Sequence, residues 1–186
     1  MIEIPTLNTA RLILRPYSPA DAPHIQELIG DYDVSKNLLV VPHPYPDGAA
    51  EEFVSTHAQA VKEGLLNWAI TTSAGQFIGG CSMHITHHRR AVLGYWIGKS
   101  YWGQGLMKEA VEAMIAYGFT THHLIRIEAT SFLDNPNSAR VMAKAGMSQE
   151  GRLRNYYDTS AGIKDALIHS ITYQDWRSNL DSKMKR

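Results

Sequence analysis

Apolar residues recur along the chain at two different spacings, and the change between them predicts where strands give way to helices. Residues 91–97 form an apolar run of β-branched and aromatic side chains, which is typical of a buried strand. Between Leu106 and Phe119 the apolar residues recur at helical spacing, with charged residues between them. The segment from 91 to 119 is therefore predicted to run from a strand through a turn into a helix.

Other segments follow the same two patterns. Further strands are expected at residues 11–15, 68–71, 77–85, 125–130, 151–157 and 164–172, with a turn at residues 159–162 between the last two. Further helices are expected at residues 19–30 and 48–64, in a short segment that ends at Gly146, and around Trp176. The expected N-caps are Ser18 for the first helix, Asp47 for the second, and Asn137 or Ser138 for the helix before Gly146.

This order of elements predicts an α/β fold. Strands with helices inserted at intervals indicate a mixed sheet that is covered by helices on both faces. The strand–helix–strand unit over residues 91–130 should form a parallel crossover. A ligand is expected in the crevice where the carboxyl ends of neighbouring strands part, beside residues 98–107.

Length and composition restrict the class of protein. A chain of 186 residues predicts a single domain over residues 1–186. Eighteen basic and eighteen acidic residues cancel, which gives no electrostatic reason to expect a nucleic acid or an anionic membrane as partner. One cysteine, Cys81, excludes an internal disulfide framework, and there is no signal segment or apolar run of membrane-spanning length. We therefore expect a cytoplasmic protein.

The turn at residues 98–107 has the features of a phosphate-binding site. Its glycines let the backbone approach a ligand, and the first N–H groups of the following helix lack helical partners and carry partial positive charge. Two standard motifs fit poorly. A P-loop needs four residues between its glycines where three separate Gly94 from Gly98, and a dinucleotide-binding turn from Gly103 needs a glycine where Lys108 stands. A strand-to-helix turn without a ligand remains the alternative.

Six short motifs, taken in order and spacing, make the chain similar to one family. They are residues 9–16 with Asp21, residues 95–98, 101–105, 134–138 and 144–147, and residues 151–154 with Asp165. Together they resemble the GNAT superfamily of acetyl-CoA-dependent N-acetyltransferases, in its RimJ/RimL-like branch, over nearly the whole length. The resemblance implies a GNAT-type fold, in which a bulge splays the strand that holds Trp96 and Ile97 away from the strand at residues 125–130.

The resemblance also implies which residues bind acetyl-CoA. Backbone N–H groups of the bend would hold the pyrophosphate, and the pantetheine arm would pair with the splayed strand edge. Trp102 takes the first place of the family's Gln/Arg-x-x-Gly-x-Gly/Ala pattern, and Met107 replaces the small residue expected last. The implied binding residues are Trp96, Ile97, Gly98, Trp102, Gly103, Gln104, Gly105, Leu106, Met107, Asn135 and Ser138.

Three residues are candidates for the chemistry of amine acetylation. The N–H of Ile97 is the expected donor to the oxyanion that forms on the thioester carbonyl. Ser138 is expected to hydrogen-bond or protonate the departing sulfur, or to cap its helix, because Met142 stands where many members of the superfamily carry a tyrosine acid. Glu128 is the candidate base, acting through a water, and its alternative is a structural carboxylate.

The acceptor amine is less defined. At pH 7 an α-amine with a pKa of ~7.8 costs only ~1 kcal/mol to deprotonate, whereas a lysine at ~10.4 costs ~4.6 kcal/mol, so a site with no evident strong base favours the α-amine. The resemblance implies a protein N-terminus, typically ribosomal. Tyr45 is a candidate for the acceptor side, and Glu51 and Glu52 would favour a cationic acceptor if they lay at the mouth of the site.

Several alternatives stay open. Similar sequences acetylate polyamines or aminoglycosides, and a CoA-binding module without activity or a nucleotide-binding α/β protein could use the same turn. No metal is expected, because the pairs His87-His88 and His122-His123 lack the carboxylate or cysteine of a metal-ligand pattern. Both a monomer and a homodimer are compatible with the sequence.

Overall fold

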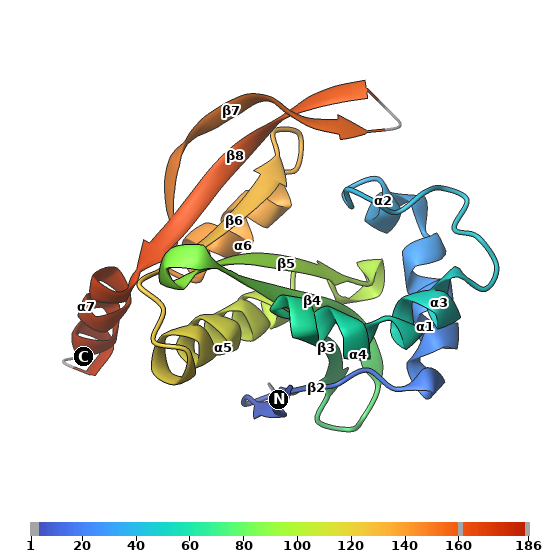
Figure 1. Ribbon diagram of the computed structural model, residues 1–186, viewed down its shortest axis with the longest axis horizontal. Helices are drawn as coiled ribbons and strands as arrows, with labels where there is room; N and C mark the ends of the chain where they lie inside the picture. Colours follow the sequence, from blue (N-terminus) through green and yellow to red (C-terminus); the bar gives the residue numbers. More distant parts are fainter. Residues whose placement is uncertain (1–3, 160–161, 185–186) are drawn as a thin grey trace.

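The computed structural model describes residues 4–159 and 162–184, and within them the strands form one mixed sheet (Figure 1). The strands are β1 (Leu7–Asn8), β2 (Leu12–Arg15), β3 (Leu65–Thr72), β4 (Phe77–Thr86), β5 (Arg90–Ile97), β6 (Arg126–Phe132), β7 (Ser148–Thr159) and β8 (Gly162–Thr172). Their spatial order is β1-β2-β3-β4-β5-β6-β8-β7. β5 and β6 run parallel, as predicted, and the other neighbours are antiparallel.

The α-helices connect these strands. They are α1 (Ala22–Gly30), α2 (Tyr32–Ser35), α3 (Ala49–Ser55), α4 (His57–Ala60), α5 (Leu106–Thr121), α6 (Pro136–Lys144) and α7 (Tyr173–Met184). Short 3-10 turns precede α1 and β3 and separate β4 from β5, and a fourth at Lys99–Tyr101 follows β5. Among the described residues, no helix is long and apolar enough to cross a membrane.

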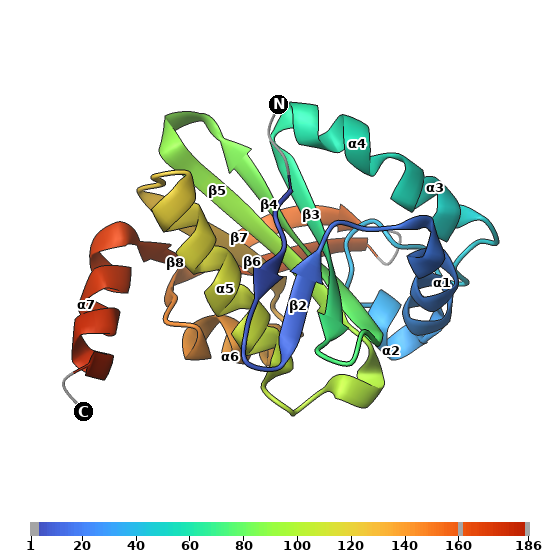
Figure 2. The ribbon, with the colours of Figure 1, turned by 90° about the horizontal axis from the view of Figure 1, so that it is seen from below.

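Helices cover both faces of the sheet, which confirms the predicted fold class (Figure 2). Trp68 of β3 points into a core that α5 shares through Met114. The next residue, Ala69, points to the opposite face and packs in a second cluster with Ile25 of α1 and Ala50 of α3. Because successive side chains of a strand alternate between faces, one strand supports both layers.

The sheet opens between β5 and β6. The two strands pair only from Arg90–Arg126 to Leu93–Ala129. Beyond that point β5 remains paired with β4 as far as Ile97, and β6 remains paired with β8 as far as Phe132. β5 and β6 therefore diverge (Figure 1). The predicted splay is therefore confirmed. The predicted bulge is wrong, because the register between β4 and β5 runs without a shift, and the opening begins at Gly94.

Two predicted helix caps are wrong. The N-cap of α3 is Gly48, with φ of 80°, in place of Asp47. The N-cap of α6 is Asn135, whose side-chain oxygen accepts the N–H of Ser138, so neither Asn137 nor Ser138 caps this helix. Ser18 does begin a helical segment, a 3-10 turn that leads into α1. Two residues of the predicted turn at 159–162, positions 160 and 161, lie outside the described residues.

Candidate active site

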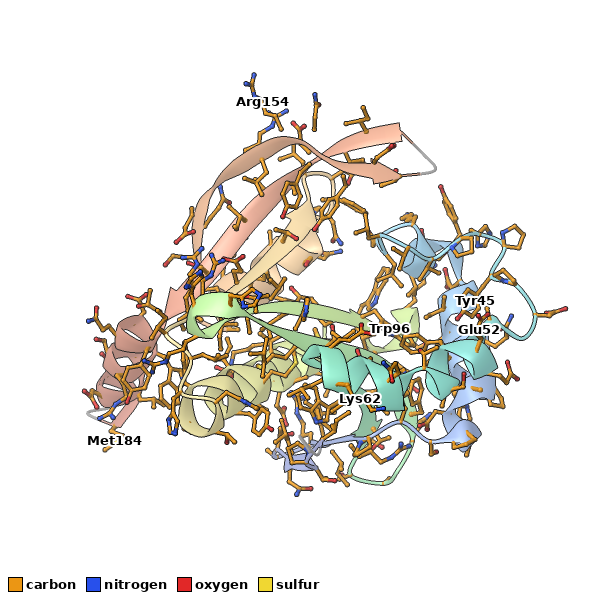
Figure 3. The ribbon with its side chains drawn as sticks, viewed as in Figure 1. Tyr45, Glu52, Lys62, Trp96, Arg154 and Met184 are labelled. Carbon is orange, nitrogen blue, oxygen red and sulfur yellow. The ribbon has the colours of Figure 1, made fainter. Side chains whose placement is uncertain are left out.

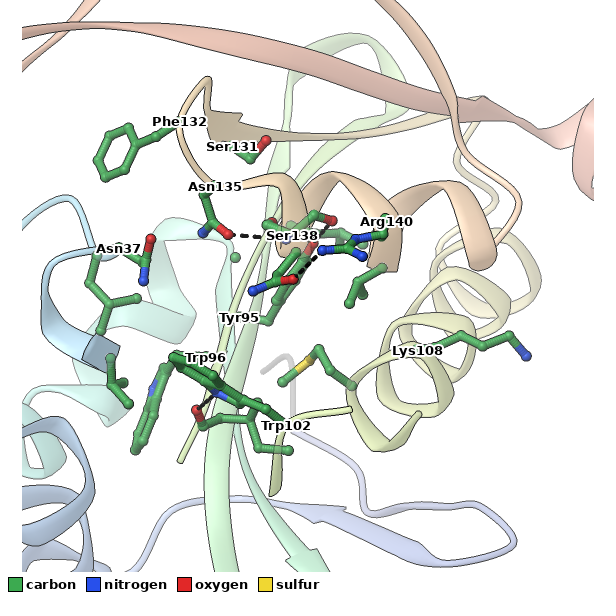
Figure 4. Close-up of a pocket in the computed structure, with 18 of the residues that line it drawn as sticks. Asn37, Tyr95, Trp96, Trp102, Lys108, Ser131, Phe132, Asn135, Ser138 and Arg140 are labelled. Carbon is green, nitrogen blue, oxygen red and sulfur yellow. Dashed lines mark hydrogen bonds between the residues drawn. The ribbon is translucent and has the colours of Figure 1, made fainter. Parts of the chain in front are cut away.

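A cavity of about 630 Å³ lies where β5 and β6 part (Figure 4). Its walls are the last residues of β5, the bend before α5, the end of β6 and α6 from its first turn to Lys144. The segment after α2, residues 37–39, and Tyr157 of β7 complete it. The cavity thus lies at the carboxyl ends of the parallel pair, where the topology predicts a ligand.

The bend that leads into α5 is shaped for an anion. Gly103 and Gly105 both have φ of 75°, in the left-handed region that glycine adopts without strain. Gly105 is the N-cap of α5 and has no side chain to satisfy the first helical N–H groups. α5 is 16 residues long, so its aligned peptide dipoles add positive potential at this end. A phosphate group fits this end of the cavity.

Residues of the segment between β1 and β2 hold the bend from behind. Arg11 donates from Nη1 to the carbonyl oxygen of Gln104 at 3.1 Å and pairs with the carboxylate of Glu109, in the first turn of α5, at 2.8 Å. Thr9 donates to the same carboxylate at 2.6 Å. Burial alone would raise the pKa of Glu109, but these hydrogen bonds hold it below its ordinary value. Glu109 therefore stays ionised and anchors Arg11 against the bend.

The end of β5 presents a free peptide edge to the cavity. Gly98 donates its N–H to the carbonyl of Ile78 on β4, and peptide groups alternate in direction along a strand. The N–H and C=O of Ile97 therefore point away from β4, toward the gap. Trp102 donates its indole N–H to this Ile97 carbonyl at 2.9 Å. The N–H of Ile97 is left facing the cavity.

A hydroxyl pair lies deeper in the cavity, between β5 and α6. The hydroxyl oxygens of Tyr95 and Ser138 are 2.9 Å apart, and the Tyr95 hydroxyl is also 3.2 Å from the carbonyl oxygen of Ser138 (Figure 4). Burial raises the pKa of Tyr95 to about 12, although the hydrogen bond with Ser138 opposes the shift. The phenol is therefore protonated at neutral pH. Sequence reasoning missed Tyr95, even though it stands in the 95–98 motif.

The ionisable side chains of the cavity are cations and phenols. Lys108, Arg140 and Lys144 line it, with Lys108 ion-paired to Glu112 at 2.9 Å and Arg140 hydrogen-bonded to Asn137 at 2.6 Å. Among the described residues that line the cavity there is no aspartate, glutamate or histidine. The cavity is thus suited to an anionic ligand and supplies no strong base.

Most of the predicted binding residues meet at this cavity. Those that line it are Trp96, Ile97, Trp102, Gly103, Gly105, Leu106, Met107, Asn135 and Ser138. Gly98 and Gln104 do not, since Gly98 pairs with β4 and the Gln104 side chain donates to the Ser100 carbonyl at 3.0 Å. The ring of Trp96 packs on the far face of the sheet, 6.0 Å from the ring of Phe77.

Glu128 lies outside the cavity. It accepts a hydrogen bond from Arg126 at 2.9 Å, and Arg126 also pairs with Glu150 of β7. The ion pair with Arg126 supports the structural alternative for Glu128, and its role as a base stays an untested prediction. Tyr45 packs against the core cluster under α1 and α3, and Glu51 and Glu52 lie exposed in the first turn of α3 (Figure 3). None of the three lines the cavity.

Comparisons with known proteins agree with this geometry. Residues 11–148 match the acetyltransferase (GNAT) domain. The uncharacterized N-acetyltransferase p20 of Bacillus licheniformis is 30% identical over 176 residues, which cover 92% of this chain and 98% of that protein. The [ribosomal protein uS5]-alanine N-acetyltransferase of Escherichia coli is 36% identical over 84 residues, 45% of this chain and 43% of that protein.

A solved structure extends the likeness to the fold. Mycobacterium smegmatis RimJ in complex with CoA-disulfide superposes with a TM-score of 0.83 at 25% identity, covering 92% of this chain and 89% of that one. The domain match covers most of the chain, and the bend, the splayed strands and the cationic lining suit coenzyme A. The chain therefore belongs to the GNAT superfamily and is an acetyl-CoA-dependent N-acetyltransferase.

Proposed function

We propose that this enzyme transfers the acetyl group of acetyl-CoA to the α-amine of a protein N-terminus. The observation that carries the proposal is the lack of any carboxylate or imidazole among the described residues that line the cavity. An α-amine needs ~1 kcal/mol to become the neutral nucleophile at pH 7, whereas a lysine or a similar alkylamine needs ~4.6 kcal/mol. The N-acetyltransferase of ribosomal protein uS5 among the relatives supports the same class of acceptor.

Charge favours this acceptor over a polyamine. The cations Lys108, Arg140 and Lys144 line the cavity, and no described lining residue carries a carboxylate; Lys108 pairs with Glu112, which lies outside the lining. A polycation would meet like charges there, whereas the anionic phosphates of coenzyme A would be attracted. A peptide N-terminus adds only one charge, which it loses before it attacks.

In this proposal, separate groups of residues bind acetyl-CoA and stabilise the transition state. The N–H groups from Gly103 to Met107 bind the pyrophosphate, and Asn135 and the open edge of β5 hold the pantetheine arm. The amine attacks the thioester directly while both substrates are bound. The Ile97 N–H stabilises the developing oxyanion, a role worth roughly 10²–10³ in rate, and Ser138 donates a hydrogen bond to the departing sulfur. The amine loses its proton to solvent.

The test is a comparison of matched acceptors by intact mass after incubation with acetyl-CoA. One peptide has a free α-amine and no lysine. Its partner has the same sequence with an acetylated N-terminus and one internal lysine, and spermidine and an aminoglycoside complete the set. We expect acetylation of the first peptide alone. Acetylation of spermidine, the aminoglycoside or the lysine peptide without the α-amine peptide would overturn the proposal, and CoA binding without any product would show a module that lacks activity.

A further inference from the structure

The hydroxyls of Tyr95 and Ser138 form a hydrogen-bonded pair, and the reaction proposed above gives a role to Ser138 but none to Tyr95. Tyr95 comes from β5 and Ser138 from the first turn of α6, 43 positions later in the chain. Both line the cavity, and their oxygens lie 2.9 Å apart. Ser138 is held in place from its backbone as well, because its N–H donates to the Asn135 side chain at 3.2 Å.

Two hydroxyl oxygens 2.9 Å apart hold one proton between them, from either residue, so the pair has two arrangements. In the first, Tyr95 donates to the Ser138 carbonyl at 3.2 Å, and the Ser138 proton turns back toward the phenol oxygen. In the second, Tyr95 donates to the Ser138 hydroxyl oxygen at 2.9 Å, and the Ser138 proton is free to point into the cavity. Only the second arrangement lets Ser138 donate to a ligand. The phenol therefore decides where the serine proton points.

The pair acts by donating hydrogen bonds, and complete proton transfer is disfavoured. Burial raises the pKa of Tyr95 to about 12. A thiol titrates near ~8.5, so moving a proton from the phenol to a thiolate would run uphill by roughly 3 to 4 pKa units. A hydrogen bond to a charged acceptor needs no such transfer and is stronger than a neutral one. A chain of two donors also polarises each bond in it.

We propose that Tyr95 is a positioning residue that donates to Ser138 and so turns the Ser138 hydroxyl toward the sulfur of coenzyme A, stabilising the thiolate as it leaves. This inference rests on the place of Ser138 beside the sulfur in the proposed function. Among the hydrogen bonds of the described residues, those of the Tyr95 hydroxyl go to Ser138, so the effect of Tyr95 passes through that residue.

The direct test is the titration of the CoA thiol bound to the enzyme, followed by the ultraviolet absorbance of the thiolate. The variants are Tyr95→Phe, Ser138→Ala and the double substitution. We expect the bound thiol to titrate below its pKa in free CoA, and each single substitution to raise that pKa by about one unit, which corresponds to a tenfold change in equilibrium. The double substitution should raise it no further than either single one.

Turnover gives a second readout. Tyr95→Phe should lower kcat about tenfold and leave KM for acetyl-CoA nearly unchanged, because the donor acts on charge that appears only as the thiolate leaves. In the Ser138→Ala background the same substitution should have almost no further effect. Tyr117→Phe is the matched control. It also removes a phenol hydroxyl with one side-chain partner, the ring of His122 at 3.1 Å, but on α5 and outside the cavity lining.

Each outcome decides something. An unchanged thiol pKa in Tyr95→Phe, or effects that add in the double variant, would overturn the role of Tyr95. If Tyr95→Phe does not fold, Ser138→Ala still tests the hydrogen-bonded pair. An unchanged thiol pKa in Ser138→Ala would overturn the pair as a donor to the thiolate. The titration needs no acceptor. A shifted thiol pKa in an enzyme that acetylates no peptide would therefore contradict the proposed acceptor and leave the inference intact.

Discussion

Arg11, just before β2, and Glu109 of α5 form an ion pair at 2.8 Å across 98 positions of the chain, and the pair stands directly behind the bend at residues 103–107. The same guanidinium donates to the carbonyl of Gln104 within the bend. The segment just before β2 thus holds the turn in which the pyrophosphate is proposed to bind. From this relationship we expect the Thr9–Pro16 motif to support cofactor binding through Arg11, which its sequence did not reveal.

Replacing Arg11 with alanine should weaken the binding of acetyl-CoA. Without the guanidinium, the bend loses the bond to Gln104 and must be ordered when the ligand binds. We expect KM for acetyl-CoA to rise by about 5- to 20-fold with a small change in kcat, measured by steady-state kinetics with a saturating acceptor. The loss of stability should stay within about 1 kcal/mol, because the Arg11 side chain is 51% exposed.

Arg152→Ala is the control for this substitution. Arg152 also pairs with a carboxylate, that of Asp165, but it lies on β7 and outside the cavity lining. Its replacement should leave KM for acetyl-CoA at the parent value. An equal rise of KM in both variants would mean that the loss of any surface ion pair loosens the enzyme, and the role of Arg11 behind the bend would then be wrong.

The ion pair between Arg15 and Asp21 should make stability depend on pH. The Asp21 side chain is only 3% exposed and accepts two bonds from Arg15, at 2.7 and 2.8 Å. Burial alone would raise the pKa of Asp21, but bonds from Arg15 and from Ser18 lower it. A depressed carboxyl pKa stabilises the fold above the unfolded value near ~3.9, and this contribution is lost as pH falls through the folded value.

Asp21→Asn isolates that contribution. We expect the substitution to cost about 2 kcal/mol of unfolding free energy at pH 7, because hydrogen bonds to a charged group are lost. The difference from the parent should begin to shrink below about pH 4, where the carboxyl of the unfolded chain takes up its proton, and it should vanish below the depressed pKa of folded Asp21, where the folded carboxyl is protonated as well. Urea unfolding at several pH values measures this. A difference that stays constant down to the acid limit would show that the charge of Asp21 contributes nothing.

The cap of α6 should be essential for placing Ser138. Asn135→Ala removes the oxygen that accepts the Ser138 N–H, and we expect a loss of about 1 kcal/mol in unfolding free energy together with a fall in kcat. Asn135→Ser keeps a capping oxygen and should restore the stability. If it restores stability without activity, Asn135 contacts the substrate in addition to capping the helix. Equal losses of stability in both variants would contradict the capping role.

The sequence predicted the elements whose pattern is long enough to show a period. The apolar spacing between Leu106 and Phe119 is long enough for about four helical turns, and the helix found there, Leu106–Thr121, matches that segment closely. The two-residue strand β1 and the four-residue helix α2 have no measurable period, and both were missed. The helix cap before Gly146 was misplaced because three good cap residues stand within four positions. Pro136 was the discriminating signal, since proline favours the first helical position.

The candidate site was predicted only in part, for a related reason. The glycine bend can be recognised in the sequence, because only glycine adopts the positive φ values of Gly103 and Gly105 freely. The pairing of Tyr95 with Ser138 cannot be recognised in the sequence. It depends on how α6 packs against β5, and α5 and β6 lie between these two elements in the chain. Successive side chains of β5 alternate between the two faces of the sheet, so Tyr95 and Trp96 are predicted to lie on opposite faces. This alternation does not predict which helix covers each face.

Glu128→Gln should leave the pH dependence of catalysis unchanged. Glu128 is held by Arg126 outside the cavity, so it has no path to the proton of the amine. We expect kcat/KM to follow the same curve with pH in both enzymes, rising as the α-amine of the acceptor loses its proton near ~7.8. The acceptor peptide is the same in each assay, so its own titration cancels in the comparison. A curve for Glu128→Gln that loses a limb of the parent profile would contradict the structural role of this carboxylate and restore it as the base.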